Sequence, residues 1–356
     1  SSDLNFQLAR TPEQAGDYLR RLWAMSPMVD SVLGKFNSDA DAGWIPPRSL
    51  LEGGLDFLDG FSAPAPREHS LYTALMDQVN SSEAFTAEQR EQVGNEAATI
   101  IATVIYPAYR NAVKTVNDRL TQARKEDGIW AQPLGDQFYR TAIRTEAGSD
   151  KSAAVIHALG LAEVERIHTE MDVLLQSLGY REGSVGQRWQ QISAESSVQY
   201  PVSTAAVATA ADSTAAREQL LAPIDERIAA MQAQLPNWFG RLPSQGLEVR
   251  QVTEPNQDTA PMGRYDGHSA DGQRPGIFWI NLRDMGEVTR LTVPTLVYHE
   301  TVPGHHLARA LAYEQVDKPL LWRFALNTVY SEGWGMYSEL LAAEMGVYES
   351  DPLGDL

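Results

Sequence analysis

The segment 299–306 reads His-Glu-Thr-Val-Pro-Gly-His-His and constrains the local fold more than any other segment of the chain. It holds three of the seven histidines of the 356-residue sequence, next to a glutamate. A regular helix cannot continue through Pro303 and Gly304, because proline removes a backbone donor and clashes with the preceding turn, and glycine is a weak helix former. The chain must therefore distort here, and the distortion decides which histidines share a face.

This cluster of imidazoles beside a carboxylate indicates a metal site. Neutral imidazole and carboxylate groups are the usual ligands of a catalytic zinc that keeps one position open for water, and an adjacent glutamate can accept the proton of that water. In the common HExxH motif the two histidines lie one helical turn apart, at i and i+4. Position i+4 after His299 is Pro303 in this chain. A π-bulge at Pro303-Gly304 would place His305 where the i+4 ligand normally stands.

We therefore predict that His299 and His305 bind zinc and that Glu300 is the general base. On an ideal helix His306 would share the face of His299 but lie about two turns, roughly 10 Å, further along. His306 is accordingly expected to support the site or to face the substrate. The exchange of His305 and His306 stays open as an alternative.

A third protein ligand is expected from a following helix, because a catalytic zinc usually has three. Residues 319–345 read as one apolar helix that stops at Gly346. Glu332 and Glu339 lie two turns apart on one face of it. An ionised carboxylate without a partner is costly in apolar surroundings. We predict Glu332 as the ligand, whereas Glu339 could hold metal or face the substrate, or be an ordinary solvated residue.

The same residues carry a family resemblance. The pattern HExxPGHH followed by EGW, here 299–306 and Glu332-Gly333-Trp334, resembles the bacterial family of domain of unknown function 885. Segments 128–139, 160–164 and 274–281 extend the resemblance upstream. The family is placed among gluzincin-type zinc metallopeptidases, whose HExGH aligns through its Gly-His with Gly304-His305. The resemblance implies a mainly helical gluzincin-like architecture, and it implies incompleteness at the C-terminus, because family members usually continue beyond the EGW helix.

Composition is that of a soluble globular protein, with 43% hydrophobic and 21% charged residues. The net charge of −18 argues against nucleic-acid binding, which needs basic surfaces. The sequence has no cysteine, so disulfides and thiolate chemistry are excluded. No apolar run reaches the length of about 18 residues that would indicate a transmembrane helix. The bacterial periplasm or cell envelope and the cytoplasm all remain open as locations.

The chain is predicted to be mainly α with a small β-sheet. Capping signals at Thr11 and Thr86 open helices that run to about residue 36 and residue 125, the second kinked at Pro107. Helices are also expected at 150–178, interrupted near Gly160, and at 213–235. We expect a single domain over 1–356, with a subdivision into a helical region, 1–245, and a region of sheet and metal-site helices, 246–356, as an alternative.

Strand signals cluster just before the metal motif. Residues 247–252 alternate in polarity, and 276–281 form a short apolar run after a Pro-Gly turn. The second run is the candidate edge strand that would pair with an extended peptide, and a core strand is the alternative. Tyr265, His268 and Arg274 are expected in a polar loop, where they could contribute to transition-state stabilisation, with His268 at the surface.

These patterns lead to the expectation of a zinc-dependent peptidase that acts on a peptide substrate, with Glu300 as general base. A metal-dependent hydrolase of another amide or ester is the alternative within enzymes. A non-catalytic cell-envelope binding protein that keeps the fold is the alternative outside them. The sequence indicates neither substrate-binding residues nor oligomeric state.

Overall fold

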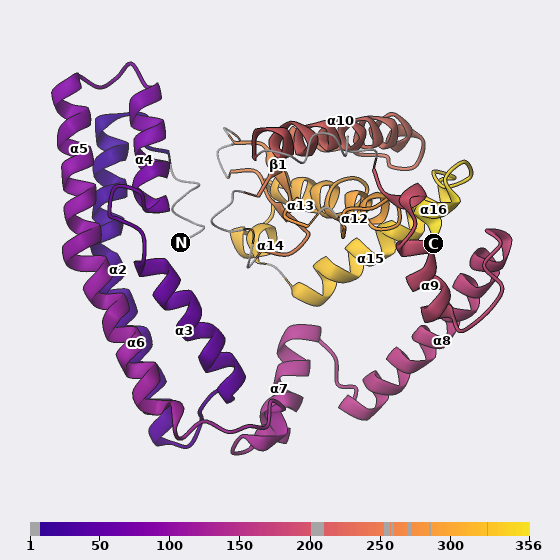
Figure 1. Cartoon of the computed structure of the whole chain (residues 1–356), viewed down its shortest axis with the longest axis horizontal. Coiled ribbons are helices and arrows are strands. Elements are labelled where there is room, and N and C mark those ends of the chain that lie inside the picture. The colour runs from indigo at the N-terminus through magenta and orange to yellow at the C-terminus, as the bar shows by residue number, and fades with distance from the viewer. Residues whose placement is uncertain are drawn as a thin grey trace. The chain divides into compact units, whose positions relative to one another are not determined.

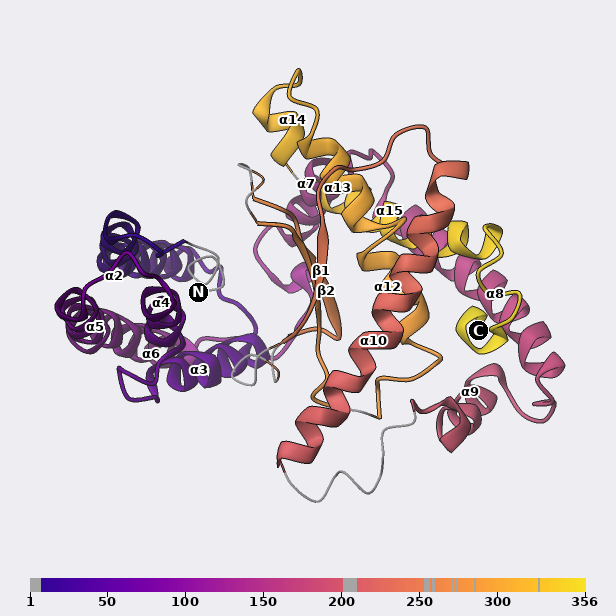
Figure 2. The same ribbon diagram turned by 90° about the horizontal axis from the view of Figure 1, so that it is seen from above.

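The computed structural model describes residues 8–200, 210–252, 257, 260–269, 272, 274–284, 286–325 and 327–356, with backbone only for 210–219. The chain divides into two compact units, Ser1–Thr141 and Ala142–Leu356. Both are dominated by helices, and one small sheet lies in the second unit (Figures 1 and 2), so the expected fold class is confirmed. None of the described helices is long and apolar enough to cross a membrane.

The first unit is a helical bundle in which α2 packs against α4, α5 and α6 (Figure 1). Thr11 caps α2 by accepting from the Gln14 amide, and Thr86 forms the predicted capping box with Gln89. At Pro107 the expected kink is a π-helical turn, Ile101–Ile105, that joins α5 to α6. The helices of this unit are α2 (Pro12–Asp41), α3 (Arg48–Ser62), α4 (Ser70–Ser81), α5 (Ala87–Ile100) and α6 (Tyr106–Leu120), followed by α7 (Gly135–Ala147), which contains the boundary.

The second unit builds a helical layer on a three-stranded sheet. Its strands are β1 (Leu247–Gln251), β2 (Gly263–Asp266) and β3 (Gly276–Ile280), in the order β1-β3-β2. β1 runs parallel and β2 antiparallel to β3. The helices are α8 (Ala153–Ser177), α9 (Val185–Ser193), α10 (Ala210–Gln234), α12 (Val293–Glu300), α13 (His305–Tyr313), α14 (Leu320–Phe324), α15 (Thr328–Glu344) and α16 (Pro352–Asp355).

One core joins α10, the sheet and the metal-motif helices. Met231 of α10, Phe278 of β3, Val297 of α12 and Ala342 of α15 are buried in the same cluster. Figure 2 shows α10 beside the strands and α12. α10 therefore belongs to the same compact unit as the sheet and the metal-motif helices, and this unit begins at Ala142.

Four local expectations differ from the structure. α8 continues through Gly160 without interruption. The single helix expected over 319–345 is two helices, because Asn327 caps a new helix, α15, by accepting from the Tyr330 amide. Residues 263–266, expected in a loop, form β2. The expected edge strand β3 is the central strand, since both of its edges are paired, so it offers no free edge to a peptide.

Candidate metal centre

The motif segment is two helices joined by a tight turn, not one helix with a π-bulge. α12 ends at Glu300 and α13 begins at His305, and the Val302–Pro303 peptide between them is cis. A side chain at Gly304 would put its Cβ 2.0 Å from the carbonyl oxygen of His299, so only glycine fits there. Trp334 of α15 fastens the turn by donating its Nε1–H to Pro303 O at 2.9 Å. The new helix start aims His305 back toward His299.

Three predicted ligands meet at this junction. The Nε2 atoms of His299 and His305 lie 3.5 and 3.6 Å from Oε2 of Glu332. One ligand atom from each residue lies within 4.8 Å of the other two. Two ligand atoms at about 2.0–2.1 Å from a tetrahedral zinc are roughly 3.4 Å apart, so these separations suit such an ion. The Glu332 side chain is 53% exposed, which leaves the group open to solvent on that side.

Helix α15 also positions His299 through two residues that contact its ring. Oε1 of Glu339 lies 2.6 Å from Nδ1 of His299, so the ring donates its Nδ1–H to Glu339 and keeps its Nε2 lone pair toward Glu332. A Cβ at Gly335 would lie 2.5 Å from His299 Nε2, so the ring packs directly on the helix backbone. Glu339 therefore holds the imidazole in place and does not belong to the three-residue group.

Glu300 is buried next to this group. The backbone N–H of Tyr265 on β2 favours its ionised carboxylate. Burial raises the pKa of Glu300 to about 7, with the nearby Glu332 carboxylate adding to the rise and His299 and Arg309 opposing it. Burial likewise lowers the pKa of His305 to about 4, which keeps its ring neutral and able to donate a lone pair. Hydrogen bonding to Glu339 raises the pKa of His299.

His306 lies elsewhere. It is buried, and its Nδ1 is 2.9 Å from the hydroxyl of Tyr265. It is outside the three-residue group, and its burial leaves no face toward a substrate. Gly276 makes room for this pair, because a Cβ there would lie 2.3 Å from the Tyr265 hydroxyl oxygen. His306 thus joins α13 to the sheet and steadies β2, the strand that contacts Glu300.

The other two residues of the expected polar loop, His268 and Arg274, lie as expected in the connection between β2 and β3. His268 is buried with its ring 5.0 Å from that of Tyr313, so it is not a surface residue. Arg274 donates to the carbonyl oxygen of Gly267 at 2.6 Å. The sequence patterns did not identify Gly335 or Arg309 as site residues. Arg309 could have been found from its spacing, because it lies four residues after His305 and so shares its helix face.

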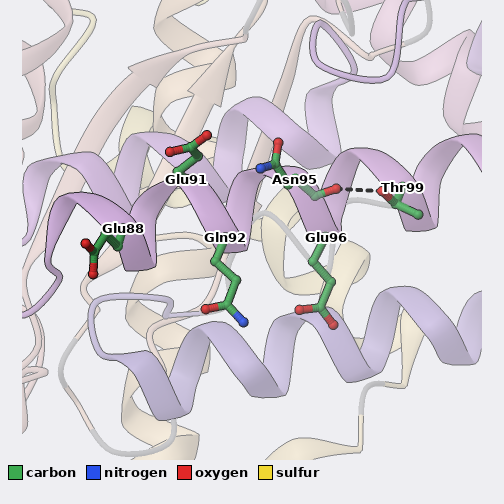
Figure 3. Close-up of a pocket in the computed structure, with 6 residues that line it drawn as sticks. All are labelled: Glu88, Glu91, Gln92, Asn95, Glu96 and Thr99. Atoms are coloured by element: carbon green, nitrogen blue, oxygen red, sulfur yellow. Dashed lines mark hydrogen bonds between the residues drawn. The ribbon is translucent and has the colours of Figure 1, made fainter.

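A cleft of about 430 Å³ opens beside the candidate metal centre. His299, Glu300 and Glu339 form its polar end. The rest of its wall is mainly apolar and comprises Trp189, Met262, Leu291, Thr292, Thr295, Leu296 and Leu356. A second hollow lies on the surface of α5 in the first unit (Figure 3), lined by Glu88, Glu91, Gln92, Asn95, Glu96 and Thr99. It contains no histidine and only solvated side chains, so the first cleft is the candidate substrate site.

Comparison with known proteins agrees with the fold. Residues 3–356 match the family described as "Bacterial protein of unknown function (DUF885)", and the chain belongs to this family. A solved structure, described as that of "the putative lipoprotein from Colwellia psychrerythraea", is 36% identical with a TM-score of 0.93. The match covers 99% of this chain and 58% of that chain, so this chain spans a little over half the length of that protein. No curated protein matches.

Proposed function

We propose that the protein is a zinc-dependent peptidase of the gluzincin type. The single observation that carries the proposal is the convergence of His299 Nε2, His305 Nε2 and a Glu332 carboxylate oxygen within 4.8 Å of one another. Glu300 stands next to His299 in the chain and lines the adjoining cleft. Two imidazoles and one carboxylate are the ligand set of several catalytic zinc sites that keep a position open.

The chemistry divides between the ion and the chain. A bound zinc supplies Lewis acidity, which polarises a scissile carbonyl and lowers the pKa of water toward about 7. Glu300 accepts the proton of the attacking water and passes it to the leaving nitrogen. The backbone N–H of Tyr265 favours the ionised form of Glu300, which is the form that accepts a proton. Glu339 keeps the His299 ring in the tautomer that presents Nε2.

The cleft supports a preference for apolar substrate side chains. Leu291, Leu296, Met262 and Trp189 would desolvate an aliphatic or aromatic group placed beside Glu300. We also propose that the protein works in the bacterial cell envelope, since the matched Colwellia psychrerythraea protein is described as a lipoprotein.

Metal retention tests the proposal and the ligand assignment together. Protein equilibrated with zinc and then passed through a desalting column is expected to retain one zinc per chain by elemental analysis. His305→Ala is expected to lose it, whereas His306→Ala, the adjacent buried histidine, is expected to keep it as long as the fold is intact. Absence of stoichiometric zinc in the unmodified protein would leave the non-catalytic binding protein as the better proposal. Zinc retention with cleavage of esters but not of peptides would instead favour the other hydrolase.

A further inference from the structure

Arg309, on α13, is a partly buried cation with unused hydrogen-bond donors. Its Nε is buried and has no hydrogen-bond partner. Its Nη1 makes one long hydrogen bond, 3.5 Å, to the carbonyl oxygen of Tyr265. The guanidinium carbon lies 5.9 Å from the centroid of the Tyr265 ring. Among the described residues no carboxylate oxygen lies within 4 Å of the guanidinium nitrogens of Arg309.

Two other arginines of this unit are largely removed from solvent and are paired with acids: Arg188, 4% exposed, pairs with Asp172, and Arg227 donates to Asp351 at 2.9 Å. The partly buried Arg323 instead donates its Nε–H to the carbonyl oxygen of Tyr313 at 2.9 Å, whereas Nε of Arg309 has no partner. A guanidinium has five N–H donors in a planar fork that matches a carboxylate. Burying such a cation without an anion is costly. In a chain with a net charge of −18, an arginine without a carboxylate partner at this position is best explained by an anion that comes with a ligand.

The position of Arg309 relative to Glu300 follows from β2. The backbone N–H of Tyr265 favours the ionised carboxylate of Glu300, and the carbonyl oxygen of Tyr265 accepts the Arg309 hydrogen bond. The N–H and C=O of one strand residue point to the same edge of the strand. Glu300 and Arg309 therefore both lie at this edge of β2. Arg309 also lies one helical turn beyond His305 on the same face of α13.

We propose that Arg309 binds a carboxylate of the substrate, one residue beyond the scissile bond. This inference rests on the proposed peptidase function and adds a substrate class to it. In an extended peptide, the terminal carboxylate of the residue after the scissile bond lies about one residue, roughly 3.5 Å, from the reacting carbonyl. Because Glu300 and Arg309 lie at the same edge of β2, a substrate carbonyl held beside Glu300 would bring this carboxylate toward Arg309. The protein then removes a single residue from a free C-terminus, or cleaves before an acidic side chain.

The test compares matched substrates on the zinc-loaded chain. An N-blocked apolar dipeptide with a free C-terminal carboxylate is compared with its C-terminal amide, and with an amide whose last residue is Glu. We expect the free acid to be cleaved with a kcat/KM about 10–100-fold higher than the plain amide, the gain typical of a hydrogen-bonded charge pair. A gain for the Glu amide instead of the free acid would assign the pocket to an acidic side chain.

Variants then attribute the preference to this residue. Arg309→Met is expected to remove the preference for the carboxylate substrate, measured as the ratio of kcat/KM for the free acid to that for the plain amide. Arg309→Lys keeps the charge and is expected to retain some of the preference. Arg250→Met, which removes a half-exposed arginine on β1, is the matched control and is expected to change neither rate. An unchanged preference in a folded Arg309→Met protein would overturn the inference.

Binding separates failure of this inference from failure of the proposed function. Calorimetric titration with an N-acetylated apolar amino acid is expected to show binding of the acid, none of its amide, and loss of acid binding in Arg309→Met. If no peptide is cleaved but this pattern holds, the peptidase proposal fails and the carboxylate site stands. If both peptides are cleaved at equal rates and the acid binds no better than the amide, the carboxylate site fails and the peptidase proposal stands.

Discussion

The Nδ1 atom of His299 lies 2.6 Å from Oε1 of Glu339, while the Nε2 atom of the same ring lies 3.5 Å from Oε2 of Glu332. One helix, α15, thus supplies both the group that orients the imidazole and the carboxylate that shares its open side. A carboxylate on the far nitrogen of a ligating histidine fixes the tautomer and raises ligand basicity. The relationship makes Glu339 a positioning residue whose effect can be separated from that of Glu332.

Glu339→Gln is expected to weaken zinc binding by about 10–100-fold, because the amide holds the ring less firmly and carries no charge. Competition with a chromophoric chelator measures the change. Glu344→Gln serves as the control, since Glu344 is an exposed carboxylate on the same helix. Equal affinities for the Glu339 and Glu344 variants would show that the 2.6 Å contact does not support the site.

Glu300→Gln is expected to retain zinc and to lose about 10²–10⁴-fold in kcat on a peptide substrate, since a positioned general base is removed. Metal content and kcat are measured on the same preparation. Loss of zinc along with activity would show that Glu300 is a metal ligand. Full activity would show that another residue is the general base.

Gly335→Ala is expected to displace the His299 ring and to weaken zinc binding, because the new Cβ would lie 2.5 Å from Nε2. Gly333→Ala is the matched control on α15, since a Cβ there meets nothing within 4 Å. That control is expected to bind zinc normally and to stabilise the helix by about 0.5–1 kcal/mol. The chelator titration and thermal unfolding of both variants test the close approach of ring and backbone.

The first unit is expected to lose stability in mild acid through His69. This buried ring accepts the Leu71 amide with Nδ1 and donates from Nε2 to Phe61 O, so the folded state needs it neutral. Burial lowers the pKa of His69 below its ordinary value of 6.5. Because the unfolded chain binds the proton more readily, the stabilisation is complete above about pH 6.5 and declines as the pH falls below it.

Unfolding free energies of the natural chain and of His69→Asn between about pH 7.5 and 5 measure this contribution. Asparagine keeps a helix-capping oxygen but does not titrate, so the difference between the two proteins is expected to shrink toward acid pH. The exposed His157→Asn variant is the control and is expected to leave the unfolding free energy of the first unit unchanged, since His157 lies in the second unit. A constant difference for His69→Asn across this range would contradict the assignment.

Adjacent leucines on α15 are expected to differ sharply in their effect on stability. Leu341 is 7% exposed in the core that supports the metal-site helices, whereas Leu340 is 55% exposed. Leu341→Ala is expected to cost about 2–5 kcal/mol in free energy of unfolding. Leu340→Ala is expected to stay within about 0.5 kcal/mol of the unmodified chain. Denaturant unfolding measures both, and equal costs would show that another surface covers Leu340.

Local chemistry made several elements predictable. The caps at Thr11 and Thr86, the strand at 276–280 and the break at Pro303-Gly304 follow from signals that span only a few residues. The motif also identified the three residues that the structure brings together. The helix expected over 319–345 was wrong because the apolar pattern alone would continue it, whereas Asn327 caps a new helix and so divides it.

The helical class, the caps and the adjacency of His299 and Glu300 can be read from the sequence, because they depend on residues within one or two turns of each other. The folded chain was needed to show that Glu339 holds His299, that His306 is bonded to Tyr265, and that Nε of Arg309 is buried without a hydrogen-bond partner among the described residues. It also decided that β3 is central, since the partners of a strand are chosen by packing. The physical reason is that such contacts join residues up to 44 positions apart in the chain, and no local preference records which surfaces meet when the core is buried.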